Sequence, residues 1–276
     1  MVSTFGERLH GAMRERGALC VGIDPHASLL QQWGLPDDAS GVERFSRTVV
    51  EALAGEVAVL KPQSAFFERH GSRGIAVLER VIAEARSAGA LVLMDAKRGD
   101  IGSTVQAYAD AYLNPSSPLC SDAVTASPYL GFESLRPLID TALAHGNGVF
   151  VLARTSNPEG SEVQNAHGPD GRSVADTVLD HVRAANAGAA PMGSIGCVFG
   201  ATLDAEGVDL RINGPLLAPG VGAQGASVGD LAEVFGPAIP LVLPSVSRSI
   251  LGAGPDPADL QKAARSINDE VSKLSI

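Results

Sequence analysis

The sequence predicts an α/β fold in which eight strand–helix units close into a (β/α)8 TIM barrel. Eight short apolar runs recur along 276 residues, and segments with helical spacing lie between most of them. Strands that alternate with helices pair in parallel through right-handed crossovers. Eight such units fit a barrel in a chain of this length, and no linker divides the chain, so we expect a single domain over residues 1–276. A doubly wound open sheet is the alternative.

Each predicted strand is a short, unbroken apolar run, which is typical of a strand buried on both faces. Turn residues or charged residues bound most of the runs. In chain order the runs are Ala18–Ile23, Val57–Leu60, Leu91–Met94, Ala123–Ala126, Gly148–Leu152, Ile195–Phe199, Leu216–Ala218 and Pro240–Leu243.

The predicted helices have apolar residues three or four positions apart, on one face of a 3.6-residue turn. In the first of them these residues are Phe45, Val49, Val50 and Leu53. The helical spacing of apolar residues is weakest between the sixth and eighth predicted strands. The predicted helices are Val42–Ala54, Ile75–Ala88, Ile101–Leu113, Ser134–Ala144, Val174–Ala187 and Pro257–Leu274.

One connection is long for a strand-to-helix loop. Residues 154–171 are rich in Gly, Pro and Asn and follow the fifth predicted strand. Loops of this length are often lids or binding loops. A surface excursion without a role explains the composition equally well, so both interpretations stay open.

Composition limits the partners and the compartment. The formal net charge is −10, which disfavours a general electrostatic grip on a nucleic-acid polymer or an anionic membrane. Cys20, Cys120 and Cys197 are far apart and lie in or beside apolar segments, so we expect free buried thiols in a reducing compartment. The histidines show no metal-binding spacing, and from the apolar pattern we expect neither a signal peptide nor a membrane span. We therefore expect a cytoplasmic protein without a metal.

The third predicted strand runs directly into alternating charge. Because strand side chains alternate between faces, Asp95 and Lys97 should project to the same side. Asp100 follows where the strand gives way to a helix. The plain interpretation is a solvated ion-pair cluster. The charges nevertheless follow a buried strand at its carboxyl end, where parallel α/β folds bind ligands, so a reactive charged site is the sharper hypothesis.

Other predicted strands also end in polar residues. Asp24 follows the first strand, Lys61 the second, and Ser127 the fourth. The seventh runs into a Gly-rich loop that begins at Pro219 and contains Gln224, and the eighth ends at Ser247 and Arg248. Small residues let backbone N–H groups approach an anion, and barrels often bind phosphate after strands seven and eight. The guanidinium of Arg248 suits a phosphate, although a flexible turn with a surface arginine is the alternative.

These residues together resemble the orotidine 5'-phosphate decarboxylase family. The family signature Asp-x-Lys-x-x-Asp-Ile-x-x-Thr is met by Asp95, Lys97, Asp100, Ile101 and Thr104. The Asp24-Pro25 turn, Lys61, the Pro-Gly-Val-Gly-Ala-Gln-Gly loop and Arg248 also fall where the family has them. The runs Arg154-Thr-Ser-Asn-Pro and Ser127-Pro-Tyr-Leu-Gly resemble the longer bacterial branch. Ser247 is a departure, since many relatives have glycine before the arginine.

The resemblance implies decarboxylation of orotidine 5'-phosphate to UMP and CO2, the last step of pyrimidine nucleotide synthesis, without metal or organic cofactor. It implies that Lys97 stabilises and then protonates a carbanion at the pyrimidine C6 while Asp95 lies against the substrate carboxylate. The remaining implied roles are a charge network and ribose contacts for Lys61, ribose contacts for Asp24, a pyrimidine contact for Ser127, and phosphate contacts for Pro219, Gln224, Ser247 and Arg248.

The resemblance also implies a homodimer with shared active sites, into which Asp100 and Thr104 reach from the neighbouring subunit. Two other functions stay open at this point. One is a related barrel enzyme that acts on a sugar phosphate and uses magnesium, such as a 3-keto-gulonate-6-phosphate decarboxylase or a hexulose-phosphate synthase. The other is a catalytically dead nucleotide-binding protein, against which the intact Asp and Lys set argues.

Overall fold

A computed structural model describes residues 3–222 and 225–274. Its eight strands pair in parallel, each with the next in sequence and the eighth with the first, so that they close into a barrel. This confirms the (β/α)8 barrel and excludes the open sheet. The strands are β1 (Cys20–Ile23), β2 (Val59–Pro62), β3 (Leu91–Arg98), β4 (Ala123–Ala126), β5 (Gly148–Arg154), β6 (Ile195–Phe199), β7 (Leu216–Pro219) and β8 (Val242–Val246).

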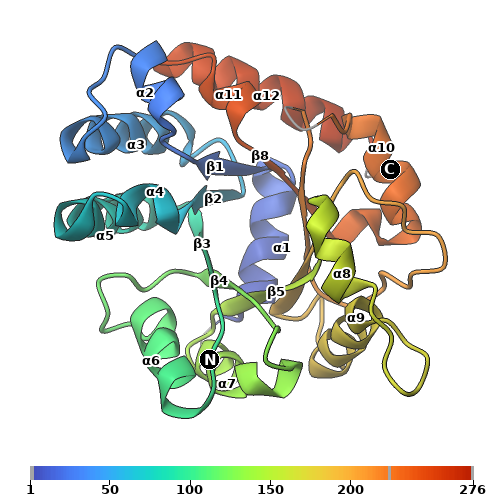
Figure 1. Cartoon of the computed structure of the whole chain (residues 1–276). Helices are drawn as coiled ribbons and strands as arrows, with labels where there is room; N and C mark the ends of the chain where they lie inside the picture. Colours follow the sequence, from blue (N-terminus) through green and yellow to red (C-terminus); the bar gives the residue numbers. More distant parts are fainter. Residues whose placement is uncertain (1–2, 223–224, 275–276) are drawn as a thin grey trace.

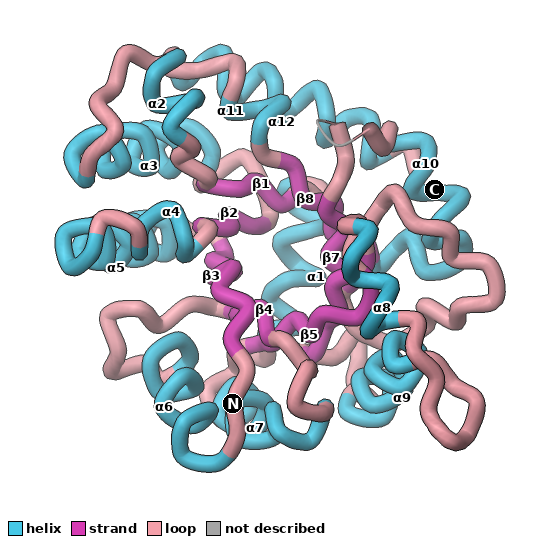
Figure 2. Tube along the Cα trace, in the orientation of Figure 1, coloured by secondary structure: helices cyan, strands magenta, loops and turns pink. Residues whose placement is uncertain are grey.

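Helices surround the ring of strands, as Figures 1 and 2 show. All six predicted helices are present, with ends that shift by a few residues. They are α3 (Ala39–Leu53), α5 (Gly71–Ser87), α6 (Gly102–Leu113), α7 (Arg136–Ala144), α9 (Val174–Ala185) and α12 (Pro257–Ser272). None of the helices in the described ranges has the length and apolar character needed to cross a membrane.

The sequence did not predict the remaining, mostly shorter helices. They are α1 (Phe5–Arg16), α2 (Ala27–Gln32), α4 (Ser64–Glu68), α8 (Ser161–Gln164), α10 (Val228–Phe235) and α11 (Arg248–Leu251), with 3₁₀ turns η1 (Phe132–Leu135), η2 (Pro158–Gly160) and η3 (Gly236–Leu241). The η3 turn includes Pro240 and Leu241, so β8 begins two residues later than predicted.

Inside the barrel, side chains change from apolar to polar toward the carboxyl ends of the strands. Each of four strands carries an apolar residue and, two positions later on the same face, a polar one. The apolar members belong to one buried core inside the barrel, whereas the polar members line a cavity. The pairs are Val59 and Lys61, Leu93 and Asp95, Ala123 and Thr125, and Leu243 and Ser245.

Helix α1 closes the apolar end of the barrel, and Figure 2 shows it behind the ring of strands. A capping box at Thr4 starts the helix, and Phe5 and Leu9 enter the same core as the barrel interior. The ring of Phe5 packs edge-on against Phe150 at 6.0 Å between centroids. A Cβ at Gly148 would lie 2.3 Å from that ring, so the close approach requires glycine there.

This packing predicts that Phe5→Ala lowers the free energy of unfolding by about 3–5 kcal/mol, because it leaves a cavity in a closed core. Urea denaturation measures the change. Leu143→Ala is the matched control, since Leu143 on α7 is 49% exposed and a surface change typically costs within about 0.5 kcal/mol. Equal losses for the two variants would contradict the assignment of α1 as part of the core.

Candidate active site

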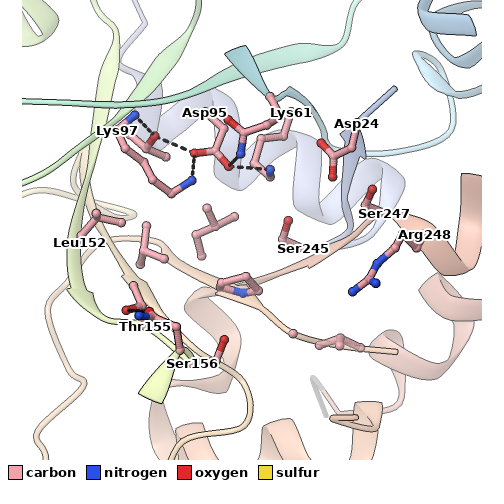
Figure 3. A pocket seen from close by; sticks show the side chains of 18 of the residues that line it. Asp24, Lys61, Asp95, Lys97, Leu152, Thr155, Ser156, Ser245, Ser247 and Arg248 are labelled. Atoms are coloured by element: carbon pink, nitrogen blue, oxygen red, sulfur yellow. Dashed lines mark hydrogen bonds and ion pairs between the residues drawn. The ribbon is translucent and has the colours of Figure 1, made fainter. Parts of the chain in front are cut away.

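The polar ends of the strands open into one cavity of about 500 Å³. In Figure 3, one side of the cavity is formed, in this spatial order, by Lys97, Asp95, Lys61 and Asp24. The predicted site residues that line it are Asp24, Lys61, Asp95, Lys97, Pro219, Ser247 and Arg248. Residues from strands that are distant in sequence therefore converge here, as expected at the carboxyl end of a barrel.

Asp95 is the centre of this array. Its Oδ2 accepts hydrogen bonds from Lys61 Nζ at 2.8 Å and from Gln63 Nε2 at 3.1 Å. Its Oδ1 accepts from Lys97 Nζ at 2.5 Å and from Thr125 Oγ1 at 2.9 Å. The carboxylate is thus saturated by donors from β2, β3 and β4 and from Gln63 directly after β2, and its orientation is fixed from several sides.

Burial and nearby charges have opposite effects on the pKa values of Asp95 and Lys61. Asp95 and Lys61 are each 6% exposed. Burial alone would raise the pKa of the Asp95 carboxyl, but the charges of Lys61 and Lys97 outweigh it and hold that pKa well below its usual range. Burial likewise opposes the charged form of Lys61, and the nearby carboxylates of Asp95 and Asp24 raise the pKa of Lys61 above its usual range. Both groups stay ionised at physiological pH.

Lys97 differs from Lys61 in its exposure. The side chain of Lys97 is 45% exposed, against 8% for Lys61, although both ammonium groups contact Asp95. Two lysines around one carboxylate leave a net positive charge facing the cavity, which favours an anionic ligand. Because Lys97 is anchored at one side and open at the other, its ammonium can also contact a bound molecule.

At the other end of the array two buried polar atoms have no hydrogen-bond partner among the described residues. They are Asp24 Oδ1 and Ser247 Oγ, and both residues line the cavity. A Cβ at Gly22 would lie 2.9 Å from Ser247 Cβ and 3.1 Å from Asp24 Oδ2, so the two side chains converge over that glycine. Unpaired buried groups of this kind indicate a ligand that supplies the missing hydrogen bonds.

Arg248 lies beside Ser247, at the far end of the cavity from Lys97 (Figure 3). Pro219 at the end of β7 and Gly220 and Val221 in the loop after it also line the cavity. A guanidinium next to a glycine-containing loop suits a phosphate. Gln224, which the sequence also assigns to this loop, lies outside the described residues.

Among the predicted site residues that the structure describes, three do not line the cavity of this single chain: Asp100, Thr104 and Ser127. Asp100 Oδ1 accepts from the amide of Ile101 at 2.8 Å, and Thr104 is exposed on the first turn of α6. Helix α6 begins only at Gly102, so Asp100 precedes the helix rather than sharing a helical face with Thr104. The amide of Ser127 donates to Arg98 O at 2.8 Å and supports the turn after β3.

The structure adds cavity residues that the sequence did not predict, among them Gln63 and the run Thr155 to Asn157 after β5. Gln164 on α8 accepts from the amide of Thr155 at 2.9 Å and donates to its hydroxyl at 2.8 Å. The long connection after β5 therefore supplies part of the cavity wall and a side chain that braces it. Its Asn-Pro and Gly content was the available signal, but it did not distinguish a wall from an excursion.

The described residues contain no group of three or more His, Cys, Asp or Glu side chains arranged to hold a metal ion. Cys20, Cys120 and Cys197 are all free and buried, as predicted. Burial raises the pKa of the Cys20 thiol to about 12, so this thiol is not a nucleophile at physiological pH.

Comparison with known proteins identifies the family. A sequence model of the orotidine 5'-phosphate decarboxylase / HUMPS family matches residues 17–264. A protein from Streptomyces coelicolor named orotidine 5'-phosphate decarboxylase is 65% identical over 261 residues, which cover 94% of each chain. A protein of the same name from Salinispora arenicola is 64% identical over 264 residues, 95% of each chain.

A crystal structure from Streptomyces avermitilis, of a protein provisionally given the same name, has the same fold. It matches with a TM-score of 0.98 at 62% identity and covers 99% of this chain and 96% of that chain. The family model spans the barrel from β1 to α12, and the named relatives align over nearly the whole length. The chain therefore belongs to the orotidine 5'-phosphate decarboxylase family.

Proposed function

We propose that the protein decarboxylates orotidine 5'-phosphate to UMP and CO2, the last step of pyrimidine nucleotide synthesis, without a metal. The observation that carries the proposal is the buried Asp95 carboxylate held between Lys61 and Lys97 at the cavity. A protein that only bound nucleotides would have no need for this array, because burying charge is costly. Relatives at 64–65% identity carry the same activity in their names.

The chemistry requires a group that stabilises negative charge at C6. When the C6–carboxylate bond breaks, its electron pair stays on C6 and CO2 leaves. The Lys97 ammonium lies next to Asp95 and is open to the cavity. We assign to it the stabilisation of the carbanion and then the transfer of a proton to C6. Asp95 would repel the substrate carboxylate, and this repulsion is relieved as CO2 forms.

The rest of the substrate would extend along the array toward Arg248. Asp24 and Lys61 would bind ribose hydroxyls, since Asp24 Oδ1 lacks a donor among the described residues. Arg248, with Ser247, Pro219 and Gln224, would bind the phosphate. The Ser247 hydroxyl is buried without a partner among the described residues, so it would add a donor where relatives with glycine have none.

We assign the pyrimidine contact to Ser156 in place of Ser127, the serine to which the family resemblance assigned it. Ser156 follows β5 and lines the cavity, whereas Ser127 follows β4 and is absent from the described lining. In Figure 3, Ser156 lies beside Thr155 across the cavity from Asp95 and Lys61. We expect the Ser156 side chain to contact a base held between Lys97 and Asp24.

We further propose a homodimer with shared active sites, in which Asp100 and Thr104 complete the site of the neighbouring subunit. Large apolar side chains are exposed after β3 and β4: Ile101 at 61%, Tyr129 at 76% and Leu130 at 52%. Exposed apolar groups next to a site are typical of an interface. The three free thiols fit a reducing compartment such as the cytoplasm.

The first prediction for this function concerns Lys97. Wild-type protein should convert the ultraviolet absorbance of orotidine 5'-phosphate to that of UMP, and Lys97→Ala should abolish the conversion. UMP affinity should stay within about tenfold, because the lost interaction acts mainly in the transition state. Lys262→Ala on α12 is the matched control and should keep wild-type turnover.

A chelator separates this proposal from a magnesium-dependent sugar-phosphate enzyme of similar fold. Turnover should persist in excess EDTA. If EDTA abolishes activity and magnesium restores it, the metal-free mechanism is wrong. In the separate test of Lys97→Ala, near wild-type turnover would overturn the role of the lysine.

Arg248→Ala should weaken binding of orotidine 5'-phosphate more than binding of orotidine. A charged hydrogen bond is worth about 1.5–3 kcal/mol, which corresponds to roughly 10- to 150-fold in affinity. Competition assays with the two ligands measure the difference, and Arg14→Ala on α1 at the opposite end of the barrel is the control. An equal loss for both ligands would contradict a phosphate role.

The shared site predicts complementation between Lys97→Ala and Asp100→Ala. Each variant alone should be nearly inactive. After subunit exchange, half of the dimers are mixed and each mixed dimer has one intact site, so activity should return to about one quarter of wild type. If mass spectrometry shows mixed dimers but activity does not return, Asp100 acts within its own chain.

A further inference from the structure

Strand β3 leaves regular register with β4 next to the proposed catalytic lysine. Met94 pairs with Val124, whereas Arg98 pairs with Ala126, so β3 contains two more residues than β4 over this stretch. Within the bulge Lys97 has a φ of 48°. This left-handed conformation is uncommon for residues other than glycine and requires support from its surroundings. Bulges of this kind re-aim side chains beside active sites.

The hydroxyl of Thr125 on β4 joins the two ends of this bulge. Its Oγ1 accepts a hydrogen bond from the Lys97 amide at 2.9 Å and donates one to Asp95 Oδ1 at 2.9 Å. The direction is forced, because an amide N–H only donates and a carboxylate only accepts. Thr125 is 1% exposed, so water does not readily replace either bond. One side-chain oxygen thus connects the backbone of Lys97 to the carboxylate that its ammonium contacts.

From this geometry we infer that Thr125 is a positioning residue for the reaction. Its hydroxyl holds the Lys97 backbone in the left-handed conformation and fixes the Asp95 carboxylate, and together these aim the Lys97 ammonium into the cavity. The inference rests on the proposed function, in which Lys97 stabilises and protonates the C6 carbanion. Nothing in the family signature includes Thr125, which lies 28 residues beyond Lys97 on another strand.

The competing explanation is that Thr125 only fills space inside the barrel. It lies two positions after Ala123, in the layer where the interior changes from apolar to polar. If packing were its whole role, valine would replace it well, since the two side chains have nearly the same shape. If the hydroxyl matters, serine should replace it well and valine should not.

The test compares Thr125→Ser, Thr125→Ala and Thr125→Val in turnover of orotidine 5'-phosphate and in binding of UMP. Serine and alanine differ by the oxygen alone, so this pair isolates the hydroxyl even if the valine variant fails to fold. We expect kcat to fall by about 10- to 100-fold in the alanine and valine variants, because small displacements of a catalytic group cost rates of this size. Serine should restore kcat to within about threefold of wild type, and UMP affinity should change by less than about threefold in all folded variants.

Two outcomes would overturn the inference. One is a kcat for Thr125→Ala equal to that of Thr125→Ser. The other is a loss of UMP affinity as large as the loss of kcat, which would indicate a ligand contact or a general collapse of the cavity. Wild-type turnover and the inactivity of Lys97→Ala test the proposed function separately, so failure of the positioning role would leave that function intact.

Discussion

The ion pair between Lys61 and Asp95 is the interaction on which the rest of the site depends. Both side chains are buried, and removing one partner of such a pair leaves an uncompensated charge that costs about 3–5 kcal/mol. Asp95 therefore needs donors on every side. Lys61, Lys97 and Thr125 supply them from β2, β3 and β4, and Gln63 supplies one from the residue after β2. Hydrophobic side chains in place of this buried ion pair would be at least as stable. Stability therefore does not explain the array, whereas a reaction of a charged substrate does. The same hydrogen bonds that satisfy Asp95 also fix the direction of Lys97.

The barrel can hold this charge because its two ends have different roles. Helix α1 packs Phe5 and Leu9 against the apolar end, and Arg8 pairs with the buried Asp122, which also accepts from the amide of Val92. The apolar core is therefore closed at the end of the barrel opposite the cavity. This division leaves a cavity at the carboxyl ends of the strands, where a substrate can replace water around the lysines.

The proposed chemistry also requires that the side chain of Lys97 be held in a precise position. A regular strand would keep its side chain in the pleat, but the β3 bulge and the positive φ of Lys97 turn it instead. Such a conformation persists only where the surroundings impose it. Asp95 accepts a hydrogen bond from the Lys97 ammonium, and the Thr125 hydroxyl accepts one from the Lys97 amide. Lys97 is therefore held at both its side chain and its backbone.

The sequence by itself determined the order of the strands, six of the helices around them and the charged residues at the strand ends. These follow from local patterns, since an unbroken apolar run is typical of a buried strand and a polar residue at its carboxyl end is typical of a site there. It did not reveal α1 as the closing helix, the β3 bulge, or the entry of Gln63, Thr125 and Thr155 into the charge array and its cavity. The cavity lining includes Ser156 after β5 and not Ser127, the serine named from the sequence. Only the tertiary structure decided these points, because they depend on the register in which eight strands close, and that register brings together residues far apart in the chain.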